Sequence, residues 1–311
     1  MKRKIIKQGH NTLTITLPRK WCELNSINSG TEVELVDKGK DLLISSSTNN
    51  SEIKRIEIDV TGKAERVVQW TLSILHKKGF DEIYIKHDKD FDVGMIHNLI
   101  KEYFMGFAIL EQTRTHCLLK TISKDNEDEF ENTLRRAFFV TISMAESCYE
   151  YLKEGKYSQL NSLISLEHTN NQLTNFCERV INKGGYKDFG NTTFTYVIVW
   201  NLEKVCDDFK YICEYFCDRW SRKEKIALSD KVMESFSDTV NYLRNFVKIY
   251  SNFEYQSLND LVKERHRIIK NLHEVLGKSN PHSSVLASYL LGCMLKITDF
   301  TPSLIAKNNQ F

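Results

Sequence analysis

Glu203 and Asp207 form the residue pair whose spacing most suggests chemistry. Residues four apart on a helix lie one turn apart on the same face, so the two carboxylates can offer oxygen ligands to a hard cation or an iron-like ion. The helical phase places them opposite the apolar stripe of their helix, on the outer face of a bundle. An acidic pair there is usually only solvated, and Lys210 could neutralise it. Metal binding and a solvated acidic surface are the two interpretations.

A later helix carries a partial copy of this pattern. Residues 201–208 align with residues 293–300, which places Asp299 opposite Asp207. The copy has Leu295 where the first helix has its glutamate, so one carboxylate is missing. The alignment predicts an internal repeat of about 90 residues with three helices in each copy, although any two amphipathic helices can be aligned this well.

Glu167 differs from the acidic pair because it lies on the apolar stripe of its own helix, between Ile164 and Asn171. Burying a carboxylate without a partner is costly. We therefore expect Glu167 to pair with a lysine or arginine inside the bundle rather than to act as a metal ligand.

No set of residues with the spacing of a catalytic site stands out. Cys177 and Cys213 are conceivable nucleophiles, but no histidine is spaced to activate either of them. Four histidines are isolated, and a surface or structural role is expected for each: His10, His97, His168 and His266. We therefore predict that the chain is not an enzyme.

The other residues with chemical potential are basic and lie at the N-terminus. The first twenty residues contain six cations and no acidic side chain, whereas the whole chain has a net charge of only +2. A phosphate backbone selects such a local surplus, because each neutralised phosphate releases a counterion. The alternative is a basic, solvated tail. The six cations are Lys2, Arg3, Lys4, Lys7, Arg19 and Lys20.

These cations lie on short β elements. Leu13, Ile15 and Leu17 alternate with threonines, which predicts a strand over 13–17. The other elements expected in this first region, residues 1–47, are a helix at 22–27, a turn at 28–30, a hairpin with strands at 33–36 and 42–44, and a polar linker at 45–51.

Residues 52–123 alternate between strand and helix and predict a small α/β module. No glycine-rich phosphate loop follows any of its strands, so no nucleotide site is expected. The expected elements are a strand at 53–60, a helix at 64–78, a strand at 82–86, a helix at 93–107, and strands at 108–113 and 116–122.

Residues 124–308 predict an all-helical region, with repeats at about 124–220 and 222–308. Short connections favour antiparallel neighbours, as in up-and-down bundles. Apolar stripes line a first helix over residues 130–152 and a second over 160–181, and the remaining helices are expected at 189–220, 223–253, 258–276 and 281–305.

The composition bounds the class of protein. The chain has 311 residues, 41% of them hydrophobic, which suits two or three domains with cores. Its eight cysteines form no Cys-x-x-Cys pair, so a zinc ribbon is not expected. We find no signal peptide and no apolar run long enough to cross a membrane. These features predict a reduced, cytoplasmic protein without membrane insertion.

The N-terminal region resembles the SpoVT/AbrB (MazE-like) DNA-binding domain. The resemblance covers residues 3–45 and rests on Gly9, Asn11, the segments 13–17 and 18–21, and the segment 30–33. It implies a swapped-hairpin β-barrel built by two chains, hence a homodimer, and a pseudo-palindromic DNA site. The positions that it implies for DNA contact are Lys4, Lys7, Asn11, Arg19 and Lys20. Lysine and arginine would hold phosphates, while Asn11 and Arg19 could reach base edges.

Residues 124–308 resemble the PhoU domain, whose Glu/Asp-x-x-x-Asp signature appears here at residues 203–207. The order of head, α/β segment and helical body is similar to that of archaeal PhoU-family regulators. The resemblance implies a pair of three-helix bundles, iron or zinc on the motif helices, and a role in phosphate homeostasis. Glu203, Asp207 and Asp299 match the motif, whereas Leu295 departs from it and places a second metal cluster in doubt.

The sequence thus predicts a multi-domain protein: an AbrB-like β-barrel, a small α/β module and an all-α PhoU-like pair of three-helix bundles. We expect a dimeric DNA-binding regulator of phosphate uptake whose body senses a state or binds a partner. One alternative is an adaptor that restrains a phosphate-transporter ATPase or a signalling kinase without binding DNA. The other is an antitoxin-like head that neutralises a toxin, which leaves the helical body unexplained.

Overall fold

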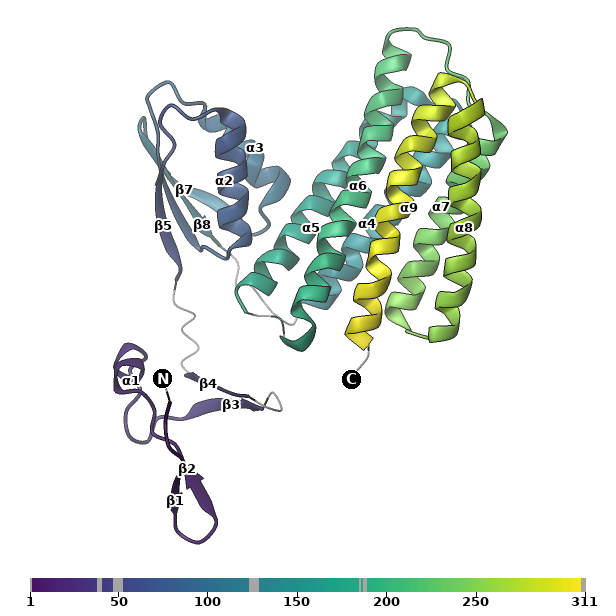
Figure 1. The fold of residues 1–311 in the computed structure, drawn as a ribbon. Coiled ribbons are helices and arrows are strands. Elements are labelled where there is room, and N and C mark those ends of the chain that lie inside the picture. The colour runs from purple at the N-terminus through teal and green to yellow at the C-terminus, as the bar shows by residue number, and fades with distance from the viewer. Residues whose placement is uncertain are drawn as a thin grey trace. The chain divides into compact units, whose positions relative to one another are not determined.

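The computed structural model describes residues 2–37, 41–46, 53–122, 129–184, 186 and 189–308. The chain divides into two compact units, Met1–Ile53 and Lys54–Phe311 (Figure 1). The first unit is built from short strands and one short helix. The second unit contains both the α/β module and the helical body, which the sequence had predicted as separate domains.

The first unit contains two separate antiparallel pairs of strands, β1–β2 and β3–β4. Gly9, with φ +73°, lies in the turn between β1 and β2. None of the side chains described in this unit is buried. The described part of this unit therefore has no core of its own, and a lone two-stranded hairpin is only marginally stable in water. Its elements are β1 (Ile6–Gln8), β2 (Thr12–Thr14), α1 (Arg19–Leu24), β3 (Val33–Asp37) and β4 (Leu42–Ser46).

Three predictions for this unit need correction. The strand expected at 13–17 is shorter, because β2 ends where its pairing with β1 ends, at Thr14 opposite Ile6. The helix expected at 22–27 begins earlier, because the amides of Trp21 and Cys22 already bond to the carbonyl of Pro18 at 2.9 and 3.0 Å. The expected linker 45–51 begins within β4, and its later part lies outside the described residues.

The α/β module is a four-stranded sheet in the order β5–β6–β8–β7, with only β5 and β6 parallel. Figure 1 shows α2 and α3 on the same side of the sheet. Alternate residues of β6, Ile83 and Ile85, are fully buried against the helix residues Val68, Leu72 and Ile96. The bounds are β5 (Arg55–Asp59), α2 (Glu65–Lys77), β6 (Glu82–Lys86), α3 (Val93–Tyr103), β7 (Phe107–Gln112) and β8 (His116–Thr121).

The helix predicted over 93–107 is four residues too long. It ends at Tyr103, and Gly106 adopts φ +75° before Phe107 opens β7. The apolar periodicity misled the prediction because Phe104 and Phe107 remain buried after the helix has ended. A left-handed backbone is easy only for glycine, so Gly106 provides the turn into the strand.

The helical body contains two sets of three mutually packed helices, α4–α5–α6 and α7–α8–α9. Packing of α6 against α9 and of α4 against α7 joins the sets around one continuous apolar core (Figure 1). The described elements are α4 (Phe130–Lys153), η2 (Tyr157–Leu163), α5 (Ile164–Asn182), η3 (Phe189–Asn191), α6 (Thr192–Ser221), α7 (Asp230–Ser251), α8 (Tyr255–Lys278) and α9 (Pro281–Asn308).

Two helix starts in the body differ from the prediction. The helix expected from residue 223 starts at Asp230, because Lys223 adopts φ +59° and Ser229 caps the new helix by accepting a bond from the Val232 amide at 3.4 Å. The stripe expected over 160–181 begins in the 3₁₀ helix η2 and becomes α-helical only at Ile164.

Side chains of α5 hold the module against the body. Arg179, fully buried, donates to the carbonyls of His76 (3.1 Å) and Phe80 (2.7 Å) and pairs with Asp81 at 2.5 Å. Further α5 donors reach carbonyls in the last turns of α2 and α3: Gln172 to Lys101 (2.5 Å), Asn175 to Tyr103 (3.1 Å) and Asn182 to Lys77 (3.0 Å). The last carbonyls of a helix lack intrahelical donors, so α5 satisfies both helix ends.

Candidate functional site

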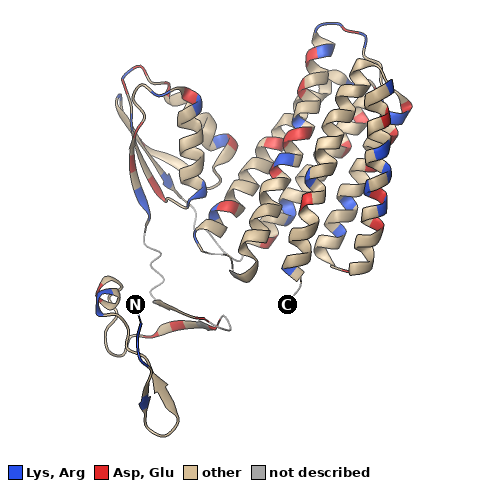
Figure 2. Ribbon diagram, viewed as in Figure 1, with Lys and Arg blue, Asp and Glu red and all other residues tan. Residues whose placement is uncertain are grey.

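The five residues predicted to contact DNA are all exposed on the first unit. Lys4 precedes β1, Lys7 lies within β1, and Asn11 lies in the turn that leads into β2. Arg19 and Lys20 open helix α1, where Arg19 pairs with Glu23 at 2.8 Å. Figure 2 shows Lys and Arg on the N-terminal segment, on β1 and on α1. The structure thus presents these side chains to solvent, as a phosphate-binding role requires.

The same unit exposes large apolar side chains that a monomeric domain would normally bury. Leu13 in β2 is 68% exposed and Ile15 is 50% exposed. An apolar surface of this kind marks an association site. The other large apolar side chains exposed in the described part of this unit are Ile5, Ile6, Leu24, Leu35, Leu42, Leu43 and Ile53.

The predicted acidic pair lies in a cavity of about 410 Å³ between helices of the module and helices of the body. We call it the module–body cavity. Its walls come from α2, α3, α5 and α6, and they include Glu167, Glu203 and Asp207. Asp207 is only 9% exposed, so the expectation of a solvated pair is wrong. The physical reason is that the module covers this face of α6.

The charges on the cavity floor alternate in sign. Lys204 lies 3.0 Å from Glu203 and 3.1 Å from Asp207. Lys210 lies 3.0 Å from the other oxygen of Asp207 and 2.6 Å from Glu167. The prediction that the buried Glu167 pairs with a lysine inside the protein is therefore confirmed. The neutralisation of Asp207 by Lys210 is confirmed as well.

Burial and these ion pairs shift the pKa values of the floor residues in different directions. Burial raises the pKa of Glu167, and the contacts with Lys210 only partly oppose it. Burial also acts to raise the pKa of Asp207, but Lys204 and Lys210 outweigh it and lower that pKa. Burial disfavours the charge of Lys204, but Glu203 and Asp207 raise the pKa of its ammonium. Of Glu167 and Asp207, Glu167 is therefore the carboxylate that is more easily protonated.

The residues of this floor do not fit a metal centre. Glu203 and Asp207 share the cavity, but each lies within 3.1 Å of a lysine ammonium that would repel a cation. Asp299 does not join them: it is exposed on α9, while its neighbour Lys296 pairs with Asp208 of α6 at 2.5 Å. Within the described ranges, no group of three or more His, Cys, Asp or Glu side chains could hold a metal ion.

The two cysteine candidates, Cys177 and Cys213, are poorly placed to act as nucleophiles. Cys177 is fully buried, and burial raises the pKa of its thiol well above the usual range. Cys213 is fully buried too, with its sulfur 3.7 Å from that of Cys148. A buried thiol in apolar surroundings is a weak nucleophile, so these cysteines behave as core residues.

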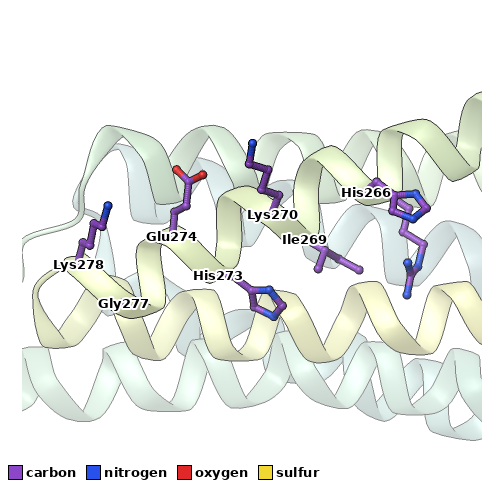
Figure 3. Close-up of a pocket in the computed structure, with 8 residues that line it drawn as sticks. His266, Ile269, Lys270, His273, Glu274, Gly277 and Lys278 are labelled. Carbon is purple, nitrogen blue, oxygen red and sulfur yellow. The ribbon is translucent and has the colours of Figure 1, made fainter.

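A second depression, of about 520 Å³, runs along α8 (Figure 3). All the residues that line it belong to that one helix, among them His266 and His273. Lys270 and Glu274 in Figure 3 project from the helix rather than toward a common point. With no second element to supply converging groups, this depression is a less suitable binding site than the module–body cavity.

Several cavity residues escaped the sequence-based prediction. Arg66 and Trp70 enter from α2, and Tyr103 enters from α3. Each fits an ordinary amphipathic helix, so only the packing of the module on the body reveals its place. The one available signal was Trp70 itself, a large aromatic side chain away from the apolar stripe of its helix and 59% exposed.

The comparisons with known proteins identify the N-terminal unit. Residues 6–51 match the family model described as antidote-toxin recognition MazE, bacterial antitoxin. No curated protein and no solved structure matches the chain. The N-terminal unit is therefore a MazE/AbrB-like antitoxin domain, followed by a mostly helical C-terminal body. None of the described helices combines the length and the apolar character needed to cross a membrane.

Proposed function

We propose that this protein is a homodimeric DNA-binding regulator whose MazE/AbrB-like domain binds DNA. The observation that carries the proposal is the pairing of exposed cations with exposed apolar side chains on a unit without a core. Two copies can bury Leu13 and Ile15 against each other and complete a barrel. The cations of both chains then serve one DNA site with two-fold symmetry.

A finer proposal concerns the regulated genes and the body. The Glu-x-x-x-Asp motif at residues 203–207 and the helical content support a PhoU-like body of the archaeal type, with genes of phosphate uptake as the targets. The absence of an activated nucleophile at Cys177 or Cys213 supports a regulatory rather than an enzymatic role. An adaptor that contacts a phosphate-transporter ATPase or a kinase is the competing proposal.

Fluorescence anisotropy tests this proposal. The full-length protein is titrated onto promoter DNA of phosphate-uptake genes across a salt series. We expect a steep salt dependence and a preference over random DNA. Arg19→Ala combined with Lys20→Ala should weaken binding and reduce the salt slope by about 1 for each phosphate that is no longer neutralised. The matched control is Arg222→Ala with Lys223→Ala, which removes the same two exposed charges from the end of α6.

Each outcome discriminates between the proposals. A control variant that loses as much affinity as the Arg19/Lys20 variant would show that net charge, not the N-terminal domain, binds DNA. No binding even at low salt would contradict DNA regulation and favour the adaptor. Binding without preference for the chosen promoters would retain the DNA role and remove the assignment to phosphate genes.

The family description supports a second candidate, recognition of a toxin by the N-terminal domain. The exposed apolar side chains of that domain would then cover a toxin surface. Co-purification of the full-length chain with a small protein, abolished by Leu13→Asp while the protein remains dimeric, would favour this candidate over the DNA-binding regulator.

A further inference from the structure

The module–body cavity is the place in the described structure where two packed parts of the protein jointly enclose a polar space. Six residues of α2 and two of α3 face residues of α5 and α6 across about 410 Å³. This volume suits a small organic molecule rather than a single ion. A molecule bound there would touch the module and the body together.

The floor of the cavity carries more acceptors than donors. Three carboxylates, Glu167, Glu203 and Asp207, face the two ammonium groups of Lys204 and Lys210. The cavity residue Lys77 is already matched by the buried Glu178 at 2.8 Å. The floor therefore has an excess of one negative charge, and the remaining cation of the cavity is the exposed Arg66 on the α2 wall.

Two buried oxygens strengthen this acceptor surplus. One oxygen of Glu167 has no hydrogen-bond partner among the described residues, and a ring nitrogen of His168 lies 3.6 Å from it. The side-chain oxygen of Asn171 has no hydrogen-bond partner among the described residues either, while the amide nitrogen of that side chain donates to Glu167 at 2.8 Å. Glu167 and Asn171 are only 1% and 2% exposed, so these oxygens have little contact with bulk water. Their field favours a cation in the cavity.

The rest of the lining combines aromatic and aliphatic side chains with the polar residues Arg66, Gln69 and Ser73. Trp70, Tyr103 and Tyr211 present aromatic rings, and Ile74 and Leu99 add aliphatic surface. Trp70 and Tyr211 are 59% and 41% exposed. The exposed Arg66 lies 5.5 Å from the Trp70 ring. Aromatic faces attract cations and bury flat apolar groups, so these walls complement the floor.

We infer that the module–body cavity binds a small primary amine whose ammonium group faces the acidic floor and whose flat apolar body lies between Trp70, Tyr103 and Tyr211. An anion fits less well at the floor, because the three lysines of the cavity are already paired with carboxylates and the remaining cation, Arg66, is exposed on the α2 wall. The bound amine contacts both α2 and α6, so binding stabilises the docked arrangement of module and body. The inference is independent of whether the N-terminal domain binds DNA.

Tryptamine, an arylalkylamine protonated at neutral pH, is a suitable probe. Calorimetric titration of the full-length protein should give a dissociation constant of about 1 mM or tighter. Tryptophol has the same ring with a neutral hydroxyl group, and indole-3-propionate has a carboxylate. We expect the neutral and the anionic compound to bind at least about tenfold more weakly, because each lacks a charge-assisted bond to the floor.

Two substitutions locate the site. Trp70→Ala and Glu203→Gln should each weaken tryptamine binding about tenfold through loss of the aromatic wall or of a floor charge. Trp200→Ala is the matched control, because Trp200 is a 46% exposed tryptophan of α6 that does not line the cavity. It should leave the affinity unchanged.

Three results would overturn the inference. One is the absence of binding at about ten times the expected dissociation constant. Another is tighter binding of indole-3-propionate than of tryptamine, which would make the cavity an anion site. The third is a loss of affinity in Trp200→Ala equal to that in Trp70→Ala, which would place the amine on an exposed tryptophan surface elsewhere.

Discussion

His76 is a buried histidine that the fold keeps neutral. Its ring stacks on Phe104 with 4.6 Å between the centroids, and neither ring nitrogen has a hydrogen-bond partner among the described residues. Burial lowers the pKa of His76 well below its usual value, and the nearby charges of Arg179 and Lys77 lower it further. The unfolded chain can protonate this histidine, whereas the folded chain excludes the proton.

This asymmetry gives a pH prediction. In the unfolded chain a histidine has a pKa of about 6.5, so below pH 6.5 the unfolded state binds one more proton than the folded state. The stability that the neutral His76 contributes is therefore complete above that pH and is lost as the pH falls below it. Between about pH 7.5 and pH 5.5 the stability of the natural protein should fall by about 1 kcal/mol more than that of His76→Phe. Urea unfolding at both pH values measures the difference.

Carboxylates with raised pKa values, such as Glu167 and Glu178, act in the opposite direction. Both carboxylates are present in the natural protein and in His76→Phe, so their effect on the pH dependence of stability cancels when the two proteins are compared. If the stability of the two proteins had the same pH dependence, the folded state would protonate His76 as readily as the unfolded state does, which would contradict the prediction.

Lys210 is the residue on which the buried charges of the cavity floor depend most. It is the ion-pair partner of Glu167 at 2.6 Å, and both groups are largely shielded from water. Lys210→Met should lower the free energy of unfolding by about 3–5 kcal/mol, because it leaves an uncompensated buried carboxylate.

The control for Lys210 is Lys263→Met. Lys263 also pairs with an aspartate three residues earlier on its helix, at 3.3 Å, but both side chains are exposed. We expect a change below about 1 kcal/mol there. Chemical denaturation compares the two variants, and equal losses of stability would contradict a special role for burial at Lys210.

At the scale of elements, α5 is unusual because polar side chains make up much of its buried surface. Asn170, Asn171, Asn175 and Arg179 are all buried. Asn170 donates to the Ala137 carbonyl of α4 at 3.2 Å, while Arg179 and Asn175 donate to the module. The helix thus serves the body core on one side and the ends of α2 and α3 on the other.

Removing Arg179 should loosen the module without unfolding the body. Arg179→Met deletes two donors to carbonyls and one ion pair, leaving Lys183 at 2.8 Å as a partner of Asp81. Hydrogen exchange should then rise in α2 and β6 while α4 keeps its protection. Arg267→Met, which removes an exposed pair with Asp238, is the control. Uniform loss of protection across all helices would contradict this prediction.

The bounds of helices and strands were predicted well where the local pattern of apolar residues determines them. The predicted strand 82–86 coincides with β6, and the boundaries of α2 were correct to one residue. The error at Phe104 arose because burial continued after the helix had ended. In the cavity, the pairing of Glu167 with a cation was anticipated because a buried carboxylate requires one, whereas Lys210 was expected only to neutralise the acidic pair. Arg66 and Trp70 were missed because only tertiary packing brings α2 over α6.

At the scale of the whole molecule, one unit has a complete core and the other does not. The second unit contains continuous apolar clusters in its module and in its body. The first unit has no buried side chain among those described. The folding of the MazE/AbrB-like domain is therefore expected to depend on association, and its stability on protein concentration.

Leu13→Asp tests this dependence. A charged side chain in the centre of β2 should prevent the association of the first units, so the mass measured by light scattering should fall from about twice 36.3 kDa to a single chain. Trp220→Asp, which places the same charge at an exposed apolar position of α6, should leave the mass unchanged. A dimer that persists in Leu13→Asp would place the association surface elsewhere.

The hydrogen bonds from α5 to the ends of α2 and α3 have a mechanical consequence. Each bond joins a side chain to one particular carbonyl group, so a rotation of the module about α5 would break several bonds at once. The boundary therefore resists rotation of the module about α5, so a turn of the body carries the module with it.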